Sequence, residues 1–197
     1  MSTNKWLSEI ELKGKLVALV PLNEQHAAGM VDAASDGELW NLWFTNVPDR
    51  TSISSYIEFA LNEQEAGRSL PFVVVENATN KVIGSTRFCN SDPVNKRTEI
   101  GYTWYSKSFQ RTAVNTECKL LLLSHVFEVL SAIAVEFRTH WHNQPSRNAI
   151  ARLGAKQDGV LRNHQKSSDG SYRDTVVFSI TNNEWLGVKA SLLSRLK

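Results

Sequence analysis

Three β-branched runs follow one another in the middle of the chain, and they constrain the fold more than any other feature. Residues 72–76 read F-V-V-V-E, residues 82–88 read V-I-G-S-T-R-F, and residues 98–105 read T-E-I-G-Y-T-W-Y. Runs rich in Val, Ile and aromatic residues with short polar connections are typical of consecutive antiparallel strands. The polar segment N-A-T-N-K at 77–81 suits a hairpin between the first two runs. We therefore expect a three-stranded meander at the centre of the fold.

Further strand and helix patterns surround this meander. Strands are predicted at 16–20, 134–139 and 175–180, with a short one ending at Val160; helices are predicted at 23–34, 54–66, 116–130, 143–153 and 183–196. The helix at 143–153 has the clearest limits, with Asn143 as N-cap, Pro145 in the first turn and Gly154 after the end. This order predicts an α+β fold, one domain over residues 1–197, in which helices flank a central mixed, mostly antiparallel sheet of six or seven strands.

Composition narrows the class of protein. A chain of 197 residues with 42% hydrophobic residues is long enough for one well-buried core. The net charge of +2 comes from scattered Lys and Arg, which argues against nucleic acid as the main partner. No apolar run approaches the length of a membrane span or a signal peptide, so we expect a cytoplasmic protein without a membrane partner. Cys89 and Cys118 are expected to be reduced and buried.

The segment 98–117 carries the first chemical signal, because a predicted strand leads through a short loop into the start of a helix. A helix N-terminus offers unpaired backbone N–H groups and the positive end of its dipole to an anion such as a pyrophosphate. Lys107 and Arg111 in the loop, and Lys119 one turn into the helix, add positive charge. Such junctions also occur as plain connections, so the physical signal leaves both interpretations open.

Three segments resemble a known family. They read E-I-G-Y-T-W-Y at 99–105, F-Q-R-T-A-V-N-T-E at 109–117, and F-R-T-H-W-H-N-Q-P-S-R-N-A-I-A-R-L-G-A at 137–155. With the order of elements, they resemble the GNAT superfamily of N-acetyltransferases, most of all the branch with the ribosomal-protein N-terminal acetyltransferases. The resemblance implies direct acetyl transfer from acetyl-CoA to a primary amine, either an N-terminal α-amine or a small amine, without a metal. A non-catalytic acyl-CoA-binding or sensor protein stays open as the alternative, and so does a homodimer.

The resemblance also implies a coenzyme-binding loop. In the family this loop reads Gln or Arg, two residues, Gly, one residue, then Gly or Ala, and its backbone amides hold the pyrophosphate. The matching positions here are Gln110, Arg111, Thr112, Ala113, Val114 and Asn115, followed by Thr116. Both glycine positions have changed, to alanine and to asparagine. Because alanine is small and asparagine tolerates left-handed backbone, we expect a retained but altered loop, with weaker coenzyme binding as one consequence.

The pantetheine arm of the coenzyme would lie along a strand in this family. The matching backbone positions are Thr103, Trp104 and Tyr105. The family's asparagine at the start of the next helix, which matches Asn143, bonds the pantetheine. A plain N-cap is the other interpretation of Asn143, and the two are compatible.

Acetyl transfer needs a neutral amine, a donor for the developing oxyanion and a proton for the leaving thiolate. The resemblance implies Glu99 as the base, acting through water, Ser146 as the proton donor and the backbone N–H of Trp104 as the oxyanion donor. Glu99 also suits a salt-bridged strand residue. Ser146 also suits a first-turn serine that bonds a helix-end N–H.

Two further clusters, one of histidines and one of aromatic residues, are candidates for the functional site. His140 and His142 have a spacing that zinc ligands use, but no third ligand has supporting spacing nearby, so no metal is expected. They are interpreted instead as part of a substrate or core wall. Trp40, Trp43 and Phe44 lie where the family places a loop over the acceptor, and ordinary packing is the alternative.

Overall fold

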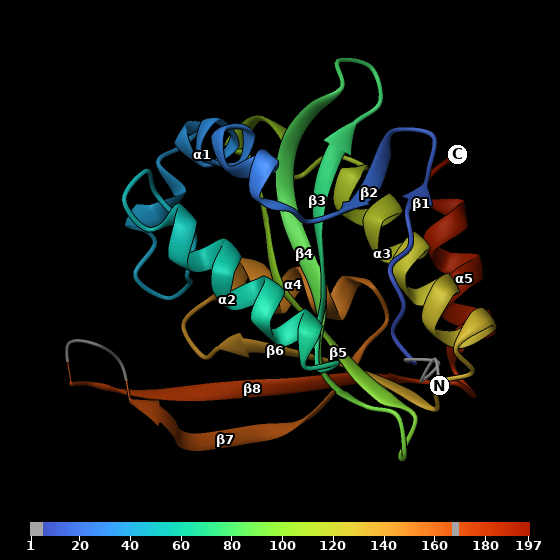
Figure 1. Cartoon of the computed structure of the whole chain (residues 1–197). Coiled ribbons are helices and arrows are strands. Elements are labelled where there is room, and N and C mark those ends of the chain that lie inside the picture. The colour runs from blue at the N-terminus through green and yellow to red at the C-terminus, as the bar shows by residue number, and fades with distance from the viewer. Residues whose placement is uncertain (1–5, 167–169) are drawn as a thin grey trace.

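An eight-stranded mixed sheet forms the centre of the molecule (Figure 1). The structure is a computed structural model, and it describes residues 6–166 and 170–197. The strand order is β1-β2-β3-β4-β5-β6-β8-β7. The strands are β1 (Leu12–Lys13), β2 (Val17–Pro21), β3 (Leu70–Glu76), β4 (Lys81–Asp92), β5 (Arg97–Tyr105), β6 (Ala134–His140), β7 (Lys156–Lys166) and β8 (Tyr172–Thr181). Among these strands, β5 and β6 pair in parallel, and every other neighbouring pair is antiparallel.

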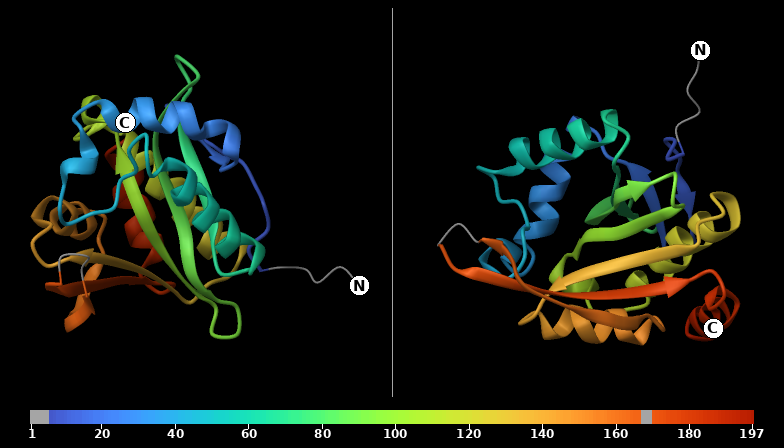
Figure 2. Two further views of the ribbon diagram at one scale, coloured as in Figure 1. Left: turned by 60° about the vertical axis from the view of Figure 1, so that its left-hand side comes forward. Right: turned by 90° about the horizontal axis from the view of Figure 1, so that it is seen from below.

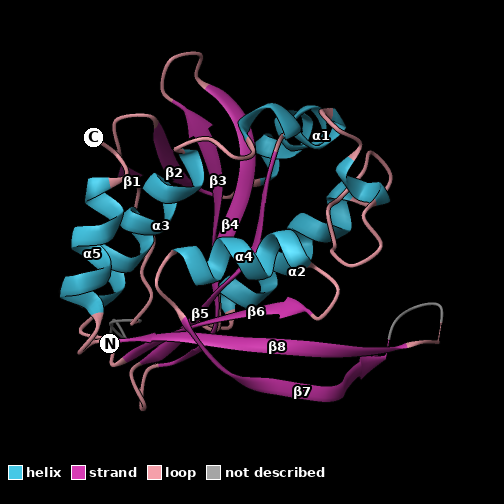
Figure 3. Cartoon of the chain, turned by 180° about the vertical axis from the view of Figure 1, so that it is seen from behind, coloured by secondary structure: helices cyan, strands magenta, loops and turns pink. Residues whose placement is uncertain are grey.

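In the part of the chain that the structure describes, five α-helices cover the two faces of this sheet (Figures 2 and 3). They are α1 (Ala27–Ser35), α2 (Ile53–Glu65), α3 (Val114–Ser124), α4 (Gln144–Arg152) and α5 (Trp185–Ser194). Residues of α1 and α2 share one buried cluster with Val73 and Trp104. Residues of α3, α4 and α5 share the other, with Phe72, Phe88 and Val135. The alternating strand residues therefore serve two separate cores, and the two faces of the sheet can have different tasks.

The predicted architecture is confirmed, with differences at the edges. The sheet has eight strands where six or seven were expected, because β1 and a long β7 add to it. Strand β7 runs on to Lys166, past the expected end at Val160; most of its residues are exposed, so hydrophobic alternation could not reveal it. The first predicted helix is divided into a 3-10 turn at Glu24–His26 and α1. The predicted helix at 116–130 is α3 followed by a π-helical turn at His125–Val129.

Helix α3 is tied to the start of the chain by a buried carboxylate. Glu117 accepts hydrogen bonds from the backbone N–H groups of Lys15, Leu16 and Val17 at 2.9, 2.7 and 2.9 Å. A Cβ atom on Gly14 would lie 2.5 Å from the same carboxylate, so only glycine lets the backbone approach so closely. Three charge-assisted bonds therefore hold the first hairpin against α3.

Within the described residues, no helix combines the length and the apolar character that crossing a membrane requires.

Candidate active site

The parallel strands β5 and β6 separate soon after they meet. Their pairing joins Arg97–Glu99 to Ala134–Glu136 and goes no further. Strand β5 then continues to Tyr105 and β6 to His140 without hydrogen bonding to each other. The β6-facing backbone groups of residues 100–105 therefore have no strand partner, and they are free to bind a ligand that enters between the two strands.

The register of β4 and β5 decides which backbone groups face this opening. The N–H of Ser106 donates to Ile83 O at 2.8 Å, and Ser85 lies opposite Trp104. Because hydrogen-bonded pairs alternate in an antiparallel ladder, the N–H of Trp104 faces β4 and that of Tyr105 faces the opening. The Gln110 side chain agrees with this, since its Nε2 donates to Tyr105 O at 3.0 Å. The register thus argues against Trp104 as the backbone oxyanion donor and favours Tyr105.

The loop before α3 has the form of an anion site. Helix α3 begins at Val114, and its N-cap residue, Ala113, forms no side-chain hydrogen bond to the helix end. The backbone of Ala113 is ordinary helical, with φ −71°, and Asn115 lies within the first turn, where its Oδ1 accepts a hydrogen bond from the Tyr105 hydroxyl at 3.1 Å. The left-handed residue is instead Arg111, with φ 61°. Replacement of the two family glycines therefore does not strain this backbone.

The charges around the loop differ from the expectation at one position. Lys107 and Arg111 are exposed beside the loop, as expected. Lys119 is buried and turns towards the sheet, where its Nζ donates to Thr103 Oγ1 at 2.7 Å. Burial lowers the pKa of Lys119 to about 8. The prediction that Lys119 adds charge to the loop was wrong, because its side chain is buried and bonds Thr103 of β5 instead.

The remaining loop positions fit a pyrophosphate. Thr112 is exposed, and its Oγ1 accepts a 3.3 Å hydrogen bond from the N–H of Val114. Thr116 is buried, so only its backbone N–H at the helix end suits a ligand. A helix N-terminus whose N-cap residue leaves backbone N–H groups available, beside two exposed cations, is an arrangement that binds phosphate groups in other proteins.

Asn143 and Ser146 lie together at the start of α4. The Asn143 Oδ1 accepts the N–H of Ser146 at 3.1 Å, so the N-cap prediction is confirmed. The Ser146 side chain is partly buried, and no described residue forms a hydrogen bond to its hydroxyl. The serine thus does not use its hydroxyl to cap the helix, and that hydroxyl is available to a ligand.

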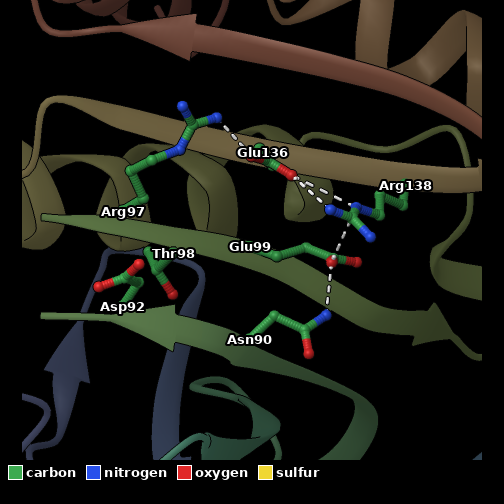
Figure 4. Close-up of a pocket in the computed structure, with 7 residues that line it drawn as sticks. All are labelled: Asn90, Asp92, Arg97, Thr98, Glu99, Glu136 and Arg138. Atoms are coloured by element: carbon green, nitrogen blue, oxygen red, sulfur yellow. Dashed lines mark hydrogen bonds and ion pairs between the residues drawn. The ribbon is translucent and has the colours of Figure 1, made fainter. Parts of the chain in front are cut away.

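Glu99 lies where β5 and β6 part, in a cavity of about 160 Å³ (Figure 4). The cavity is lined by Asn90, Asp92, Arg97, Thr98, Glu99, Glu136 and Arg138. Glu99 is 8% exposed, accepts a hydrogen bond from Asn90 Nδ2 at 2.8 Å, and lies 3.5 Å from Arg138 Nε. Burial raises the pKa of its carboxyl in spite of these two partners. The salt-bridge interpretation therefore holds, and it coexists with the perturbation typical of a catalytic base.

The neighbouring carboxyl of Glu136 is shifted the other way. Burial raises its pKa, but hydrogen bonds from Arg138, at 3.0 Å, and from Arg97 outweigh this and leave the pKa lowered. Two carboxyls on paired strands thus have pKa values pushed apart by their surroundings, which is the pattern of groups with different roles. Glu136 holds the two arginines, while Glu99, with its raised pKa, is the candidate for exchanging a proton.

His140 and His142 form a wall with Trp43. The Trp43 ring lies 5.0 Å from the His140 ring and 5.7 Å from the His142 ring, between centroids. The described residues contain no group of three or more His, Cys, Asp or Glu side chains that could hold a metal ion. Trp43 also contacts Phe44, and Trp40 lines a second cavity of about 360 Å³ beside α1.

Sequence reasoning missed three polar side chains near Glu99. Asn90 and Arg138 hold its carboxyl. Arg87 of β4 lies on the same face of the sheet as Glu99. A charged residue within the apolar run at 82–88 was a signal, since a fully buried arginine is rare unless it is paired.

Comparisons with known proteins identify the family of this chain. A family model described as an acetyltransferase (GNAT) domain matches residues 17–156. The chain belongs to the GNAT acetyltransferase family. This family uses acetyl-CoA, and the relatives' names support acetyltransferase activity and assign the chain to the acyltransferases.

Two relatives carry N-acetyltransferase names. An uncharacterized N-acetyltransferase of Bacillus licheniformis, p20, is 28% identical over 73% of this chain and 78% of its own length. YdaF of Bacillus subtilis is 32% identical over 51% of this chain and 54% of its own length. Its name describes it, provisionally, as a ribosomal N-acetyltransferase.

Solved structures share the whole fold. A GCN5-related N-acetyltransferase from Brucella melitensis is 28% identical, with a TM-score of 0.86, 97% of this chain covered and 87% of that chain. RimJ of Mycobacterium smegmatis, in complex with CoA-disulfide, has the same fold at 24% identity and a TM-score of 0.75, with 90% of this chain and 88% of that chain covered.

Proposed function

We propose that this GNAT domain transfers the acetyl group of acetyl-CoA to a primary amine by direct attack. The observation that carries the proposal is Glu99, a buried carboxyl with a raised pKa at the point where β5 and β6 separate. Unpaired backbone of β5 and the start of α3 lie beyond it along the chain. One site thus combines a candidate base with groups suited to a phosphorylated thioester.

The coenzyme contributes an activated acetyl thioester. Its pyrophosphate would be held by backbone N–H groups of residues 111–116, with Gln110 and Arg111 beside them. The pantetheine arm would lie against the backbone of residues 103–105, near Asn143. These coenzyme contacts are those that the sequence predicted. The fold supports the pantetheine contacts, because β5 has no hydrogen-bonded partner in β6 beyond Glu99.

Glu99 would take the proton from the amine, directly or through a water in its cavity. The backbone N–H of Tyr105 would then donate to the carbonyl oxygen as negative charge develops there. As the C–S bond breaks, the Ser146 hydroxyl would give its proton to the departing thiolate and regain a proton from water. Cys89 and Cys118 are buried, and burial raises the pKa of both thiols, that of Cys118 to about 12. Neither suits a covalent acyl-enzyme, so direct attack is favoured.

The acceptor we propose is an N-terminal α-amine or a small amine. At pH 7 an α-amine with a pKa of about 8 costs roughly 1.4 kcal/mol to deprotonate, and a lysine with a pKa of about 10.4 costs roughly 4.6 kcal/mol. One buried carboxyl is better matched to the smaller cost. The relative named for ribosomal N-acetylation points the same way, and a cytoplasmic location is part of this proposal.

The test is thiol release with matched peptides. Two peptides that differ only in which amine is blocked are assayed at equal concentration, beside polyamines and aminoglycosides. We expect faster transfer to the α-amine; faster transfer to the lysine would reverse the acceptor assignment. Coenzyme binding in calorimetry without thiol release for any amine would instead establish the acyl-CoA sensor.

A further inference from the structure

A cluster of buried donors without partners lies on the α2 face of the sheet. Arg87 is 1% exposed, and its Nε and both Nη atoms have no hydrogen-bond partner among the described residues. The Tyr56 hydroxyl and Trp104 Nε1 are buried without a partner as well. These five atoms are the majority of the eight such side-chain atoms in the described part of the chain. All five can donate a hydrogen bond, and none of them has an acceptor.

Aromatic rings surround the guanidinium, and they do not neutralise it. The Arg87 Cζ lies 4.0 Å from the Tyr102 ring centroid, 5.0 Å from that of Tyr56 and 6.0 Å from that of Phe59. Cation–π contacts offset part of the cost of burying a charge. They provide neither the counter-charge nor the in-plane acceptors that a guanidinium usually finds inside a protein. An anion with oxygen atoms would supply both.

The cover over Arg87 consists of partly exposed aromatic side chains. Tyr102 is 42% exposed and Phe59 is 49% exposed, so both rings lie between the guanidinium and solvent. Tyr102 has φ 50° and lies in a β-bulge, where Gly101 and Trp104 of β5 face Arg87 and Ser85 of β4. Bulges of this kind aim a side chain and are frequent beside active sites. Here the bulge directs the Tyr102 ring onto Arg87.

Arg87 and Glu99 are diagonal neighbours. Arg87 lies opposite Gly101 and Cys89 lies opposite Glu99, so all four residues share one face of the sheet. Diagonal positions are about 7 to 8 Å apart. A ligand group at Arg87 is therefore only a few bonds from an amine positioned by Glu99.

We propose that Arg87, assisted by Tyr56 and Trp104, binds a carboxylate of the acceptor, located within a few bonds of the amine that is acetylated. The position of that amine rests on the proposed function. A carboxylate matches the fork of the guanidinium and can accept the two further donors. It comes either from the α-carboxylate of a free amino acid or from an acidic side chain at the N-terminus of a peptide.

The experiment compares acceptors that differ only in this carboxylate. One arm uses peptides that begin with Asp or with Asn, and the other uses free alanine and alaninamide. Binding is measured by calorimetry in the presence of coenzyme A, and transfer by thiol release. We expect the carboxylate member of one arm to bind and react at least about tenfold better, because an amide leaves the buried charge unpaired. The arm that shows the difference identifies the source.

Three variants assign the effect to Arg87. Arg87→Met should abolish the preference, because the carboxylate member then binds and reacts no better than the amide member. Arg87→Lys should keep part of the preference, because it retains the charge without the fork. Arg152→Met, at an exposed arginine of α4, is the matched control and should behave as the wild type.

The wild-type comparison alone can overturn the proposal, so it does not depend on whether Arg87→Met folds. Equal binding of both members in both arms would overturn it. An undiminished preference in folded Arg87→Met would do the same. If no acceptor released thiol but the Arg87-dependent carboxylate binding persisted, the acetyltransferase proposal would fail and the carboxylate site would stand.

Discussion

Glu99→Gln separates the chemistry of this residue from its packing. Glutamine has the same shape, and its remaining oxygen can still accept the hydrogen bond from Asn90. The variant loses the ability to take a proton and the 3.5 Å ion pair with Arg138. Arg138 keeps its 3.0 Å contact with Glu136, so it is not left unpaired.

The expected loss of turnover is about tenfold to thousandfold, which is typical of a general base. It corresponds to about 1.4 to 4.1 kcal/mol of transition-state stabilisation. Coenzyme affinity should change little, because Glu99 lies outside the loop at 110–116. In the wild type, turnover should fall at low pH as Glu99 becomes protonated, and burial moves this fall to higher pH than for a free glutamate. The variant should lack this acid limb.

Stability gives an independent control with a defined sign. Because the folded pKa of Glu99 is raised, the stability it contributes is complete below its unfolded pKa and is lost as the pH rises through the folded pKa. At neutral pH the wild type thus carries the cost of a buried charge that glutamine avoids. We expect an equal or higher melting temperature for the variant. Wild-type turnover in a folded Glu99→Gln protein would refute the assignment of the base.

Four more substitutions test the site and its support. Ala113→Val should weaken coenzyme binding tenfold or more in calorimetry, by crowding the amides at the start of α3, while Arg111→Ala should have a smaller effect because salt screens an exposed charge; unchanged affinity in folded Ala113→Val would remove the coenzyme from this loop. Ser146→Ala should lower turnover about tenfold to thousandfold with coenzyme affinity and stability little changed, since no described residue bonds its hydroxyl; unaltered turnover would pass the proton-donor role to another group. Glu117→Ala should cost about 3 kcal/mol in chemical denaturation, chiefly for the buried N–H of Val17; a loss below about 1 kcal/mol would show that this clamp contributes little.

The elements that the sequence predicted best have a β-branched apolar run or a complete set of end signals. The strands of the central meander have such runs and are buried on both faces, and α4 has Asn143, Pro145 and Gly154 at its limits. The part of β7 beyond Val160 was not predicted, because pairing with β8, and not burial, forms it. A pattern of buried positions cannot report a strand that is mostly exposed on both faces.

Within the site, residue types were predictable and directions were not. The bulge at Tyr102 shifts the alternation of β5, and the register beyond it turns the N–H of Trp104 to β4. The inward direction of the Lys119 side chain was also not predictable, because the packing of α3 decides which face of the helix meets the sheet. Arg87 stands out in the sequence as a charge in an apolar strand, but its lack of a partner appears only in three dimensions.

The bonds between Glu117 and residues 15–17 join positions about 100 residues apart in the chain. Contacts of such sequence separation form slowly, because the entropy of closing a long loop must be overcome before the contact can stabilise anything. We therefore expect the helix that begins the candidate coenzyme site to reach its final position late in folding. An N-terminal truncation that removes residues 15–17 would consequently leave the buried Glu117 carboxylate on α3 without these three hydrogen bonds. It would disturb the coenzyme loop, although the loop's own sequence would be intact.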